Sequence, residues 1–177
     1  MANSDYKDIL QIFARNHVEY LIVGGYAFGK YAEPRYTKDM DLWVNPTKKN
    51  ARLVWGSLVE FGAPLRASGV TENTFCDPES IYQIGVAPVR IDIIMSLEGV
   101  TFEKAWSRRV ESNFGGVTAA FISLDDLILV KELAGRPQDL ADVKTLKIAR
   151  SLEKKPSQES STHNRSLEQD VDIEWDR

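Results

Sequence analysis

The pattern of apolar and polar residues divides the first 150 residues into alternating helices and strands. Ile9, Ile12 and Phe13 recur with helical spacing and predict a helix over residues 5–15, with Ser4 as its cap. We expect further helices over residues 26–31, 46–61, 101–110, 124–134 and 137–149, and strands over 20–23, 38–44, 81–86, 89–95 and 117–122. Hairpin-like and crossover connections both occur, so the pattern predicts an α+β (mixed α/β) fold with a central mixed sheet flanked by helices.

Glycine and proline residues mark the boundaries of several of these elements. Asn45 followed by Pro46 predicts a helix cap with proline in the first turn, and Gly62 predicts the end of the same helix. Pro88 predicts a turn or a sheet edge between two strands, because proline cannot donate a ladder hydrogen bond.

The composition changes at residue 151, where the chain becomes polar and rich in charged residues. Such a segment buries too little apolar surface to fold by itself, so residues 151–177 are predicted to be a disordered tail. The sequence therefore predicts one domain over residues 1–150, followed by this tail.

Charge and cysteine content exclude several classes of protein. The net charge is −4, and the tail holds seven acidic and four basic residues, which leaves 18 basic and 19 acidic residues in the first 150. This balance argues against a broad nucleic-acid-binding surface. Cys76 is the only cysteine, which excludes a disulfide framework and a zinc cluster. The N-terminal residues lack the apolar core of a signal peptide, and no apolar run is long enough for a membrane span, so we expect a cytoplasmic protein.

The candidate chemistry begins with a glycine pair that follows the first predicted strand. Gly24 and Gly25 allow the backbone to approach phosphate closely, and the next helix directs its first N–H groups at an anion. Asp39 and Asp41 then alternate with apolar residues, so a strand places both carboxylates on one face, roughly 7 Å apart. Carboxylates held rigidly in this way suit Mg²⁺. The spacing fits neither a P-loop nor a Rossmann fingerprint.

A third carboxylate, Asp92, lies in the apolar segment Val89–Met95. An ionised aspartate in such a strand needs a cation or a hydrogen-bond donor. If this strand pairs with the strand of Asp39 and Asp41, the three carboxylates converge, as two-metal phosphoryl or nucleotidyl transfer requires. The alternative is a buried aspartate that Arg90 or backbone donors satisfy, and the residues alone leave both interpretations open.

Three segments together resemble the minimal nucleotidyltransferase superfamily with the DNA polymerase β-like fold. They are VGGYA…PRYTKDMDLWV, VRIDII and ISLDDLILVKELAGRPQDLADV. Within the superfamily, the chain looks most similar to small AbiEii-type toxin nucleotidyltransferases, over about residues 5–150. The resemblance implies a nucleotidyltransferase fold and a metal-dependent transfer of a nucleoside monophosphate from an NTP to an acceptor hydroxyl, with release of pyrophosphate.

The resemblance also implies roles for individual residues. Asp39, Asp41 and Asp92 would be the catalytic metal ligands, and Asp92 would also help to deprotonate the acceptor. The residues that would bind the nucleotide are Gly24, Gly25, Arg35, Thr37 and Lys131. A supporting role falls to the R-P-x-D-x-x-D residues Arg136, Asp139 and Asp142. The chain departs from the family where Gly25 replaces a common serine, which removes one hydroxyl donor, and in lacking the additional C-terminal helical domain of longer toxin members.

Interpretations without a functional role exist for five of these residues. Lys131 is a solvated helix residue in this view, and Arg136 bonds the last carbonyls of the preceding helix. Asp139 and Asp142 favour the helix dipole without any catalytic duty, and Arg35 pairs with Glu33 or another exposed acid.

The expected partners follow from the same resemblance. They are two Mg²⁺ ions, with Mn²⁺ as an alternative, an NTP donor, an acceptor such as a tRNA end, a protein side chain or a small molecule, and a cognate antitoxin protein. The alternative function is a non-catalytic nucleotide-binding or partner-binding module of the same fold, and hydrolysis with water as the acceptor is a third. The presence of all three candidate carboxylates favours catalysis.

Overall fold

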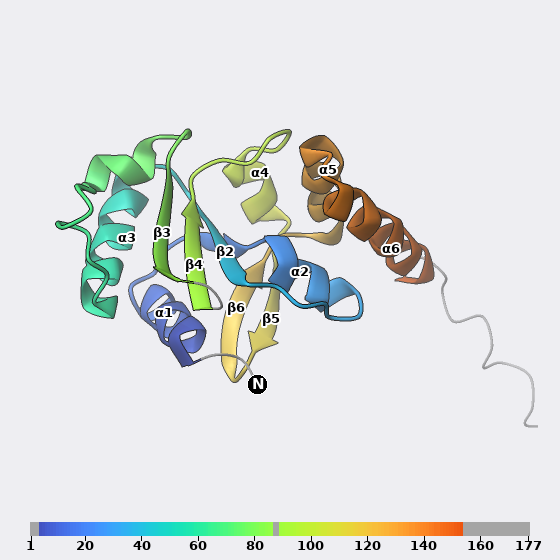
Figure 1. Cartoon of the computed structure of the whole chain (residues 1–177), viewed down its shortest axis with the longest axis horizontal. Coiled ribbons are helices and arrows are strands. Elements are labelled where there is room, and N and C mark those ends of the chain that lie inside the picture. The colour runs from blue at the N-terminus through green and yellow to red at the C-terminus, as the bar shows by residue number, and fades with distance from the viewer. Residues whose placement is uncertain (1–3, 87–88, 154–177) are drawn as a thin grey trace, which may run out of the picture.

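Six strands form one mixed sheet in the order β3–β4–β2–β1–β6–β5 (Figure 1). The computed structural model describes residues 4–86 and 89–153. The strands are β1 (Tyr20–Ile22), β2 (Asp39–Val44), β3 (Ile81–Val86), β4 (Val89–Ile94), β5 (Val110–Phe114) and β6 (Val117–Phe121). The pairs β2–β4 and β1–β6 are parallel, and the other three neighbouring pairs are antiparallel. The predicted mixed sheet with flanking helices is confirmed.

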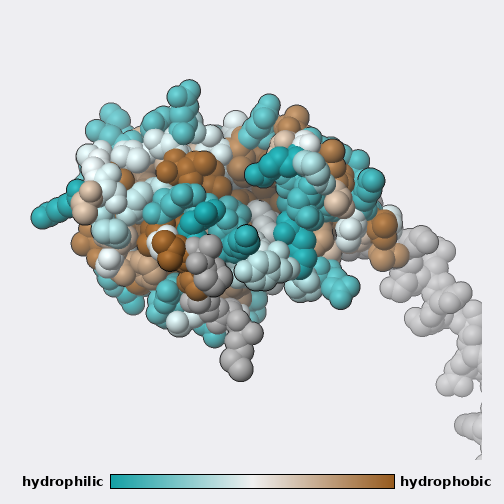
Figure 2. All heavy atoms as spheres, in the orientation of Figure 1, coloured by the Kyte–Doolittle hydropathy of each residue, from teal (hydrophilic) through white to brown (hydrophobic). Residues whose placement is uncertain are grey.

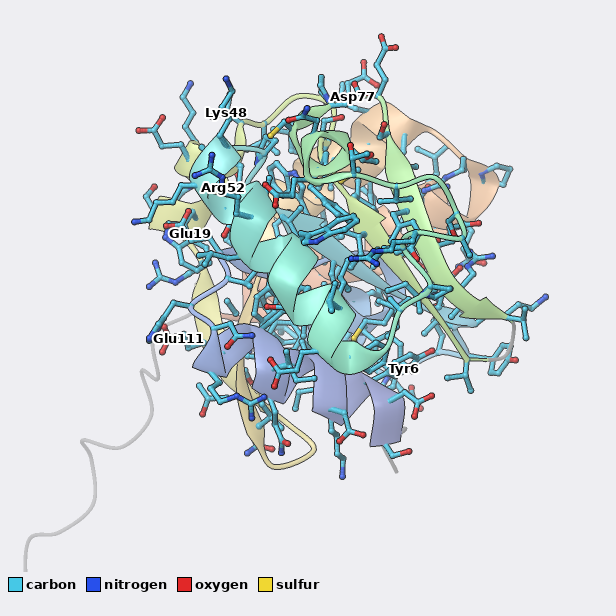
Figure 3. All side chains as sticks on the ribbon, turned by 90° about the vertical axis from the view of Figure 1, so that its left-hand side faces the viewer. Tyr6, Glu19, Lys48, Arg52, Asp77 and Glu111 are labelled. Atoms are coloured by element: carbon cyan, nitrogen blue, oxygen red, sulfur yellow. The ribbon has the colours of Figure 1, made fainter. Side chains whose placement is uncertain are left out.

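Helices cover the sheet and connect its strands. They are α1 (Ser4–Arg15), α2 (Gly24–Tyr31), α3 (Lys48–Phe61), the 3₁₀ helix η1 (Glu72–Cys76), α4 (Phe102–Ser107), α5 (Leu124–Ala134) and α6 (Pro137–Glu153). Helices α1 and α3 lie side by side in front of the strands in Figure 3, where Lys48 and Arg52 point outward from the N-terminal end of α3. Helix α2 packs on β2 and touches both α5 and α6.

The alternation along β2 separates the core from the polar face of the sheet. Met40 and Leu42 are fully buried, whereas Asp39 and Asp41 point to the opposite face and keep some exposure. Figure 2 shows hydrophilic side chains gathered across the middle of this view of the molecule, between the strands and the α5–α6 helices. The sheet therefore supports a polar surface on a rigid apolar base.

Three sequence-based expectations need correction. Thr47, and not Asn45, caps α3: the Thr47 hydroxyl accepts from the N–H of Asn50, while the Asn45 amide donates to Glu19. The helix expected over residues 101–110 ends at Ser107, and β5 begins at Val110. This strand was not predicted, because it is a largely exposed edge strand without an alternating apolar pattern.

Other expectations stand or lie outside the described residues. Gly62 ends α3 in the left-handed conformation, with φ of 86°, as predicted. Pro88 and residues 154–177 lie outside the described ranges, so a turn at Pro88 and a disordered tail stay predictions. Helix α6 continues to Glu153. Within residues 4–86 and 89–153, no helix has the length and apolar character needed to cross a bilayer, and the cytoplasmic location stays a prediction.

Candidate active site

The parallel pairing of β2 with β4 brings the three candidate carboxylates together. Asp39 lies opposite Arg90 in the register, and Asp41 lies opposite Asp92. Because side chains alternate along both strands, Asp39, Asp41 and Asp92 share one face of the sheet. The pairing that the sequence required for a three-carboxylate site is therefore present.

Arg90 is the cation that compensates two of these carboxylates. Its Nε and Nη2 donate to Asp92 at 2.8 and 3.0 Å, and Nη2 also donates to Asp39. The amide of Gln83, directly across from Asp92 in β3, donates to the same carboxylate at 3.2 Å. Sequence reasoning considered Arg90 only as a partner of Asp92. Its position two residues before Asp92 in a strand was the signal that placed it on the carboxylate face.

No arginine among the described residues hydrogen-bonds Asp41, which lies in an electrostatically unfavourable position. Burial, together with the neighbouring charges of Asp39 and Asp92, raises the pKa of Asp41 to about 7. The positive charges of Lys131 and Arg136 oppose this shift. This part of the site therefore carries more negative charge than its own cations balance.

Position 24 requires glycine, because α2 begins in close contact with the side chain of Asp41. Its φ is +61°, and a Cβ at this position would lie 1.9 Å from Oδ2 of Asp41. Any side chain here would displace the carboxylate, in addition to the strain of the left-handed backbone. The first N–H groups of α2 consequently start directly beside the carboxylates, as a phosphate cradle would need.

The side chain of Thr37 leaves room only for glycine at position 25. A Cβ on Gly25 would lie 2.6 Å from Oγ1 of Thr37, so a serine does not fit while Thr37 holds its place. The Thr37 hydroxyl donates to the backbone oxygen of Asp39 at 3.3 Å. A hydroxyl group therefore lies beside position 25, although the residue at that position has no side chain.

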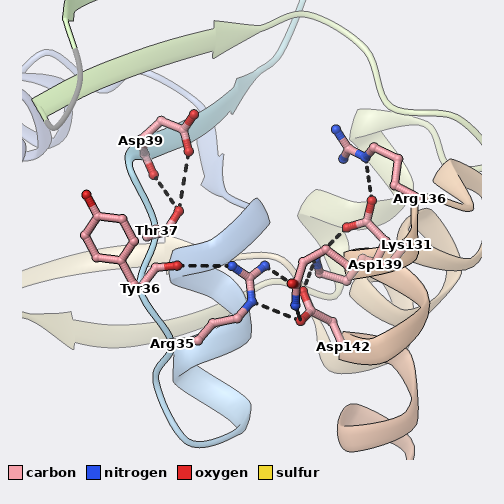
Figure 4. A network of polar contacts seen from close by, with 9 residues as sticks. Arg35, Tyr36, Thr37, Asp39, Lys131, Arg136, Asp139 and Asp142 are labelled. Carbon is pink, nitrogen blue, oxygen red and sulfur yellow. Dashed lines mark hydrogen bonds and ion pairs between the residues drawn. The ribbon is translucent and has the colours of Figure 1, made fainter.

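An ion network with a buried centre of Lys131, Asp139 and Asp142 joins this loop to helices α5 and α6 (Figure 4). Both Nε and Nη2 of Arg35 donate to Asp142, at 2.9 and 2.7 Å. The ammonium of Lys131 donates to Asp139 at 2.9 Å and to Asp142 at 2.8 Å, and Nε of Arg136 donates to Asp139 at 2.6 Å. The network fixes the position of the segment that leads into β2 and its aspartates.

The two acids of this network are ionised in spite of their burial. Burial by itself would raise the pKa of both groups, but hydrogen bonds from Lys131 and Arg136 hold the pKa of Asp139 below its usual value. Hydrogen bonds from Arg35, Lys131 and Gln138 likewise lower the pKa of Asp142 to about 2. These are charge-assisted bonds of the strong type.

The network decides between the alternatives that the sequence left open. Lys131 is not a solvated residue, because it is only 4% exposed. Arg35 pairs with Asp142 and not with Glu33, and Nε of Arg136 bonds a carboxylate. Asp139 and Asp142 therefore do more than favour the dipole of α6. Contact of Lys131 or Arg35 with a triphosphate stays a prediction.

All of these groups open into one cleft of about 360 Å³, which we call the carboxylate cleft. Its lining residues are Gly24, Gly25, Arg35, Thr37, Asp39, Asp41, Arg90, Asp92, Lys131, Arg136, Gln138 and Asp139. Every residue predicted for the site lines this cleft except Asp142. This carboxylate accepts hydrogen bonds from Arg35 and Lys131, which do line the cleft.

The donor chemistry of the cleft suits hard divalent cations. Carboxylate oxygens are the ligands that Mg²⁺ prefers, and the crowding of negative charge around Asp41 favours a bound cation. Among the described residues, no three acidic, histidine or cysteine side chains form a ready metal site as they stand. Arg90 hydrogen-bonds both Asp39 and Asp92, so a bound cation would compete with Arg90 for these two carboxylates.

The fold and the cleft together define a nucleotidyltransferase-type protein, and comparison with known proteins agrees. The chain belongs to the family described as nucleotidyltransferase of unknown function (DUF6036), whose model matches residues 5–170. No curated protein matches the sequence significantly. The match to this family confirms the superfamily, whereas nothing in the comparisons supports the narrower resemblance to AbiEii-type toxins.

Solved structures of low sequence identity share the fold. The lincosamide antibiotic adenylyltransferase LnuA, bound to lincomycin, is 17% identical with a TM-score of 0.53, over 83% of this chain and 97% of that one. A putative nucleotidyltransferase (TM1012) from Thermotoga maritima is 14% identical with a TM-score of 0.54, over 88% and 97%. The antibiotic-resistance factor ANT(2″)-Ia is 10% identical with a TM-score of 0.53, over 85% and 90%.

Proposed function

We propose that the protein transfers a nucleoside monophosphate from an NTP to an acceptor hydroxyl and releases pyrophosphate, with Mg²⁺ as the cofactor. The observation that supports this most directly is the register of β2 and β4, which places Asp39, Asp41 and Asp92 on one face beside the N-terminus of α2. Carboxylates at this point would hold the metal ions, and the helix N-terminus would hold the phosphates.

Each group of residues has a task in this proposal. Asp39, Asp41 and Asp92 hold two Mg²⁺ ions, or Mn²⁺, which when bound polarise the phosphate and lower the cost of forming the attacking oxygen. Asp92 also accepts the proton of the acceptor hydroxyl. The first N–H groups of α2 at Gly24 and Gly25 bind the phosphates.

The remaining cleft residues supply a hydroxyl and positive charge. Thr37 donates its hydroxyl to the phosphates, and Lys131 and Arg136 offset their negative charge. Arg35, held by Asp142, keeps the loop with Thr37 in position beside α2. These roles explain why the ion network reaches from α6 to the segment before β2.

The acceptor in this proposal is a hydroxyl of an RNA end, a protein side chain or a small molecule. The names of two structures with the same fold describe an adenylyltransferase of a lincosamide antibiotic and an antibiotic-resistance factor, which adds weight to the small-molecule class. A role as a toxin with a cognate antitoxin rests on the AbiEii-like resemblance alone. Growth arrest on expression that depends on Asp41 would support it, and unimpaired growth would count against it.

A labelling experiment tests the proposed reaction and finds the acceptor class. The protein is incubated with Mg²⁺ and each α-³²P-labelled NTP, together with total RNA, cell protein or a panel of hydroxyl-bearing antibiotics. We expect the label to move to one of these pools with stoichiometric release of pyrophosphate. Release of labelled NMP without a labelled acceptor would show hydrolysis instead, and the absence of both would favour the non-catalytic module.

A further inference from the structure

A second cavity continues from the carboxylate cleft along α2. It has a volume of about 420 Å³ and lies between α2, the loop that precedes β2, and the β5–β6 hairpin. It shares Gly25, Arg35 and Thr37 with the carboxylate cleft, so these residues stand at the boundary between the two spaces. We call this space the α2–β5 chamber.

The order of groups along α2 indicates where the chamber lies relative to the nucleotide of the proposed function. The α-phosphate reacts beside Asp39, Asp41 and Asp92, and the following phosphates lie at Gly24 and Gly25. The chamber begins at Gly25 and Thr37 and extends away from the aspartates toward Lys30. It therefore lies beyond the terminal phosphate, on the side of the leaving group and not of the acceptor.

The charges that line the chamber favour an anionic ligand. Lys30 and Arg35 line it, and none of the described residues that line it is acidic. Asp142 already balances the charge of Arg35, so Lys30 is the lining residue whose positive charge is available to a ligand. The ammonium of Lys30 lies 5.3 and 5.4 Å from the ring centres of Tyr31 and Phe121, and within residues 4–86 and 89–153 it pairs with no carboxylate.

The size and the remaining lining favour a ligand that also carries a ring. The volume falls within the roughly 300–1,000 Å³ range of small-molecule sites. The rings of Tyr26, Phe114 and Phe121 supply apolar walls, and Ser112 and Asn113 on β5 add polar groups. Aromatic side chains on which a base can stack, combined with positive charge for the phosphates, are a common means by which proteins bind nucleotides.

We propose that the α2–β5 chamber receives the second nucleoside of a dinucleoside polyphosphate, which makes such compounds nucleotide donors for this protein. With a diadenosine tetraphosphate, the acceptor oxygen forms a bond to the α-phosphorus, and the bond from that phosphorus to the bridging oxygen breaks. ATP leaves with the electron pair in place of pyrophosphate, and the acceptor proton passes to Asp92 and then to water. This inference rests on the proposed function and extends its substrate class.

Calorimetric titration of the full chain in Mg²⁺ tests the chamber with three ligands: ATP, adenosine 5′-tetraphosphate and diadenosine tetraphosphate. The second ligand separates an extra phosphate from an extra nucleoside. We expect the dinucleotide to bind at least about tenfold more tightly than adenosine tetraphosphate, as one stacked base provides. Lys30→Met keeps the apolar stem and removes the charge, and it should weaken the binding of both adenosine tetraphosphate and the dinucleotide, which each place a fourth phosphate in the chamber, while ATP affinity stays within about twofold.

Asn113→Asp provides an independent variant that is expected to fold. The Asn113 Oδ1 accepts from the N–H of Gly116, and aspartate retains this acceptor while adding a repelling charge to the chamber. It should weaken the binding of the same two ligands, whereas the exposed Lys144→Met control should bind all three ligands as the wild type does. A dinucleotide that binds no more tightly than adenosine tetraphosphate, or a dinucleotide affinity that neither chamber variant lowers, would overturn the assignment of the chamber and leave the proposed function intact. Absence of ATP binding to the wild type would instead contradict the proposed function, and the assignment of the chamber, which rests on it, would be rejected as well.

Discussion

Replacing Asp41 with asparagine is expected to reduce nucleotidyl transfer by at least about a thousandfold, because in the proposed function Asp41 is a charged metal ligand at the reacting phosphate. The same change should leave the melting temperature unchanged or higher. Burial and the charges of Asp39 and Asp92 raise the pKa of Asp41 to about 7, so the ionised side chain destabilises the folded protein above its ordinary pKa. A neutral isostere relieves this penalty. The measurements are the rate of label transfer and a thermal melt.

A matched control for this change is Asp125→Asn on α5. Asp125 is exposed and pairs with Arg150 at 2.9 Å, outside the cleft. We expect its rate to equal that of the wild type, since exposed pairs contribute little. Transfer by Asp41→Asn at a rate close to the wild type would show that Asp41 is not a metal ligand. A large fall in its melting temperature would assign it a structural role instead.

Lys131→Met is expected to lower the free energy of unfolding by about 3–5 kcal/mol, the cost of breaking a buried ion pair from one side. The change removes the ammonium that bonds Asp139 and Asp142, and both carboxylates are almost fully buried. Arg35 and Arg136 remain as partners, but neither can fill the space that the ammonium leaves between the two acids. Urea unfolding at neutral pH measures the difference.

Lys147→Met is the control for this effect. Lys147 pairs with Glu132 between the same two helices, but at an exposed position, so we expect a loss below about 1 kcal/mol. Equal losses for the two variants would contradict a structural role of the Lys131 network. A stable Lys131→Met protein with weakened NTP binding would show that Lys131 serves the triphosphate and not the helices.

Local patterns were sufficient to predict the parts of the site that lie on single strands and turns. Asp39 and Asp41 alternate with Met40 and Leu42, so their shared face follows from the period of a strand. The apolar segment around Asp92 indicated a central strand, and such a strand finds its place in the middle of a sheet. The convergence of the three carboxylates then needed only the pairing of β2 with β4, which the structure contains.

Contacts between distant segments were not predictable in the same way. Arg35 and Asp142 are 107 residues apart, and Glu33 offered the same chemistry two residues away. Only the packing of α6 beside α2 selects Asp142. The fit of Thr37 against Gly25 depends likewise on a loop path that no periodic pattern encodes.

The most direct test of the central claim is calorimetric titration of the wild type with ATP, with and without Mg²⁺, because it requires no knowledge of the acceptor. The account predicts binding that depends on Mg²⁺ and that is lost in the double variant Asp39→Asn, Asp41→Asn. Equal ATP affinity with and without the ion, or unchanged affinity in the double variant, would contradict a metal-dependent nucleotide site at these aspartates.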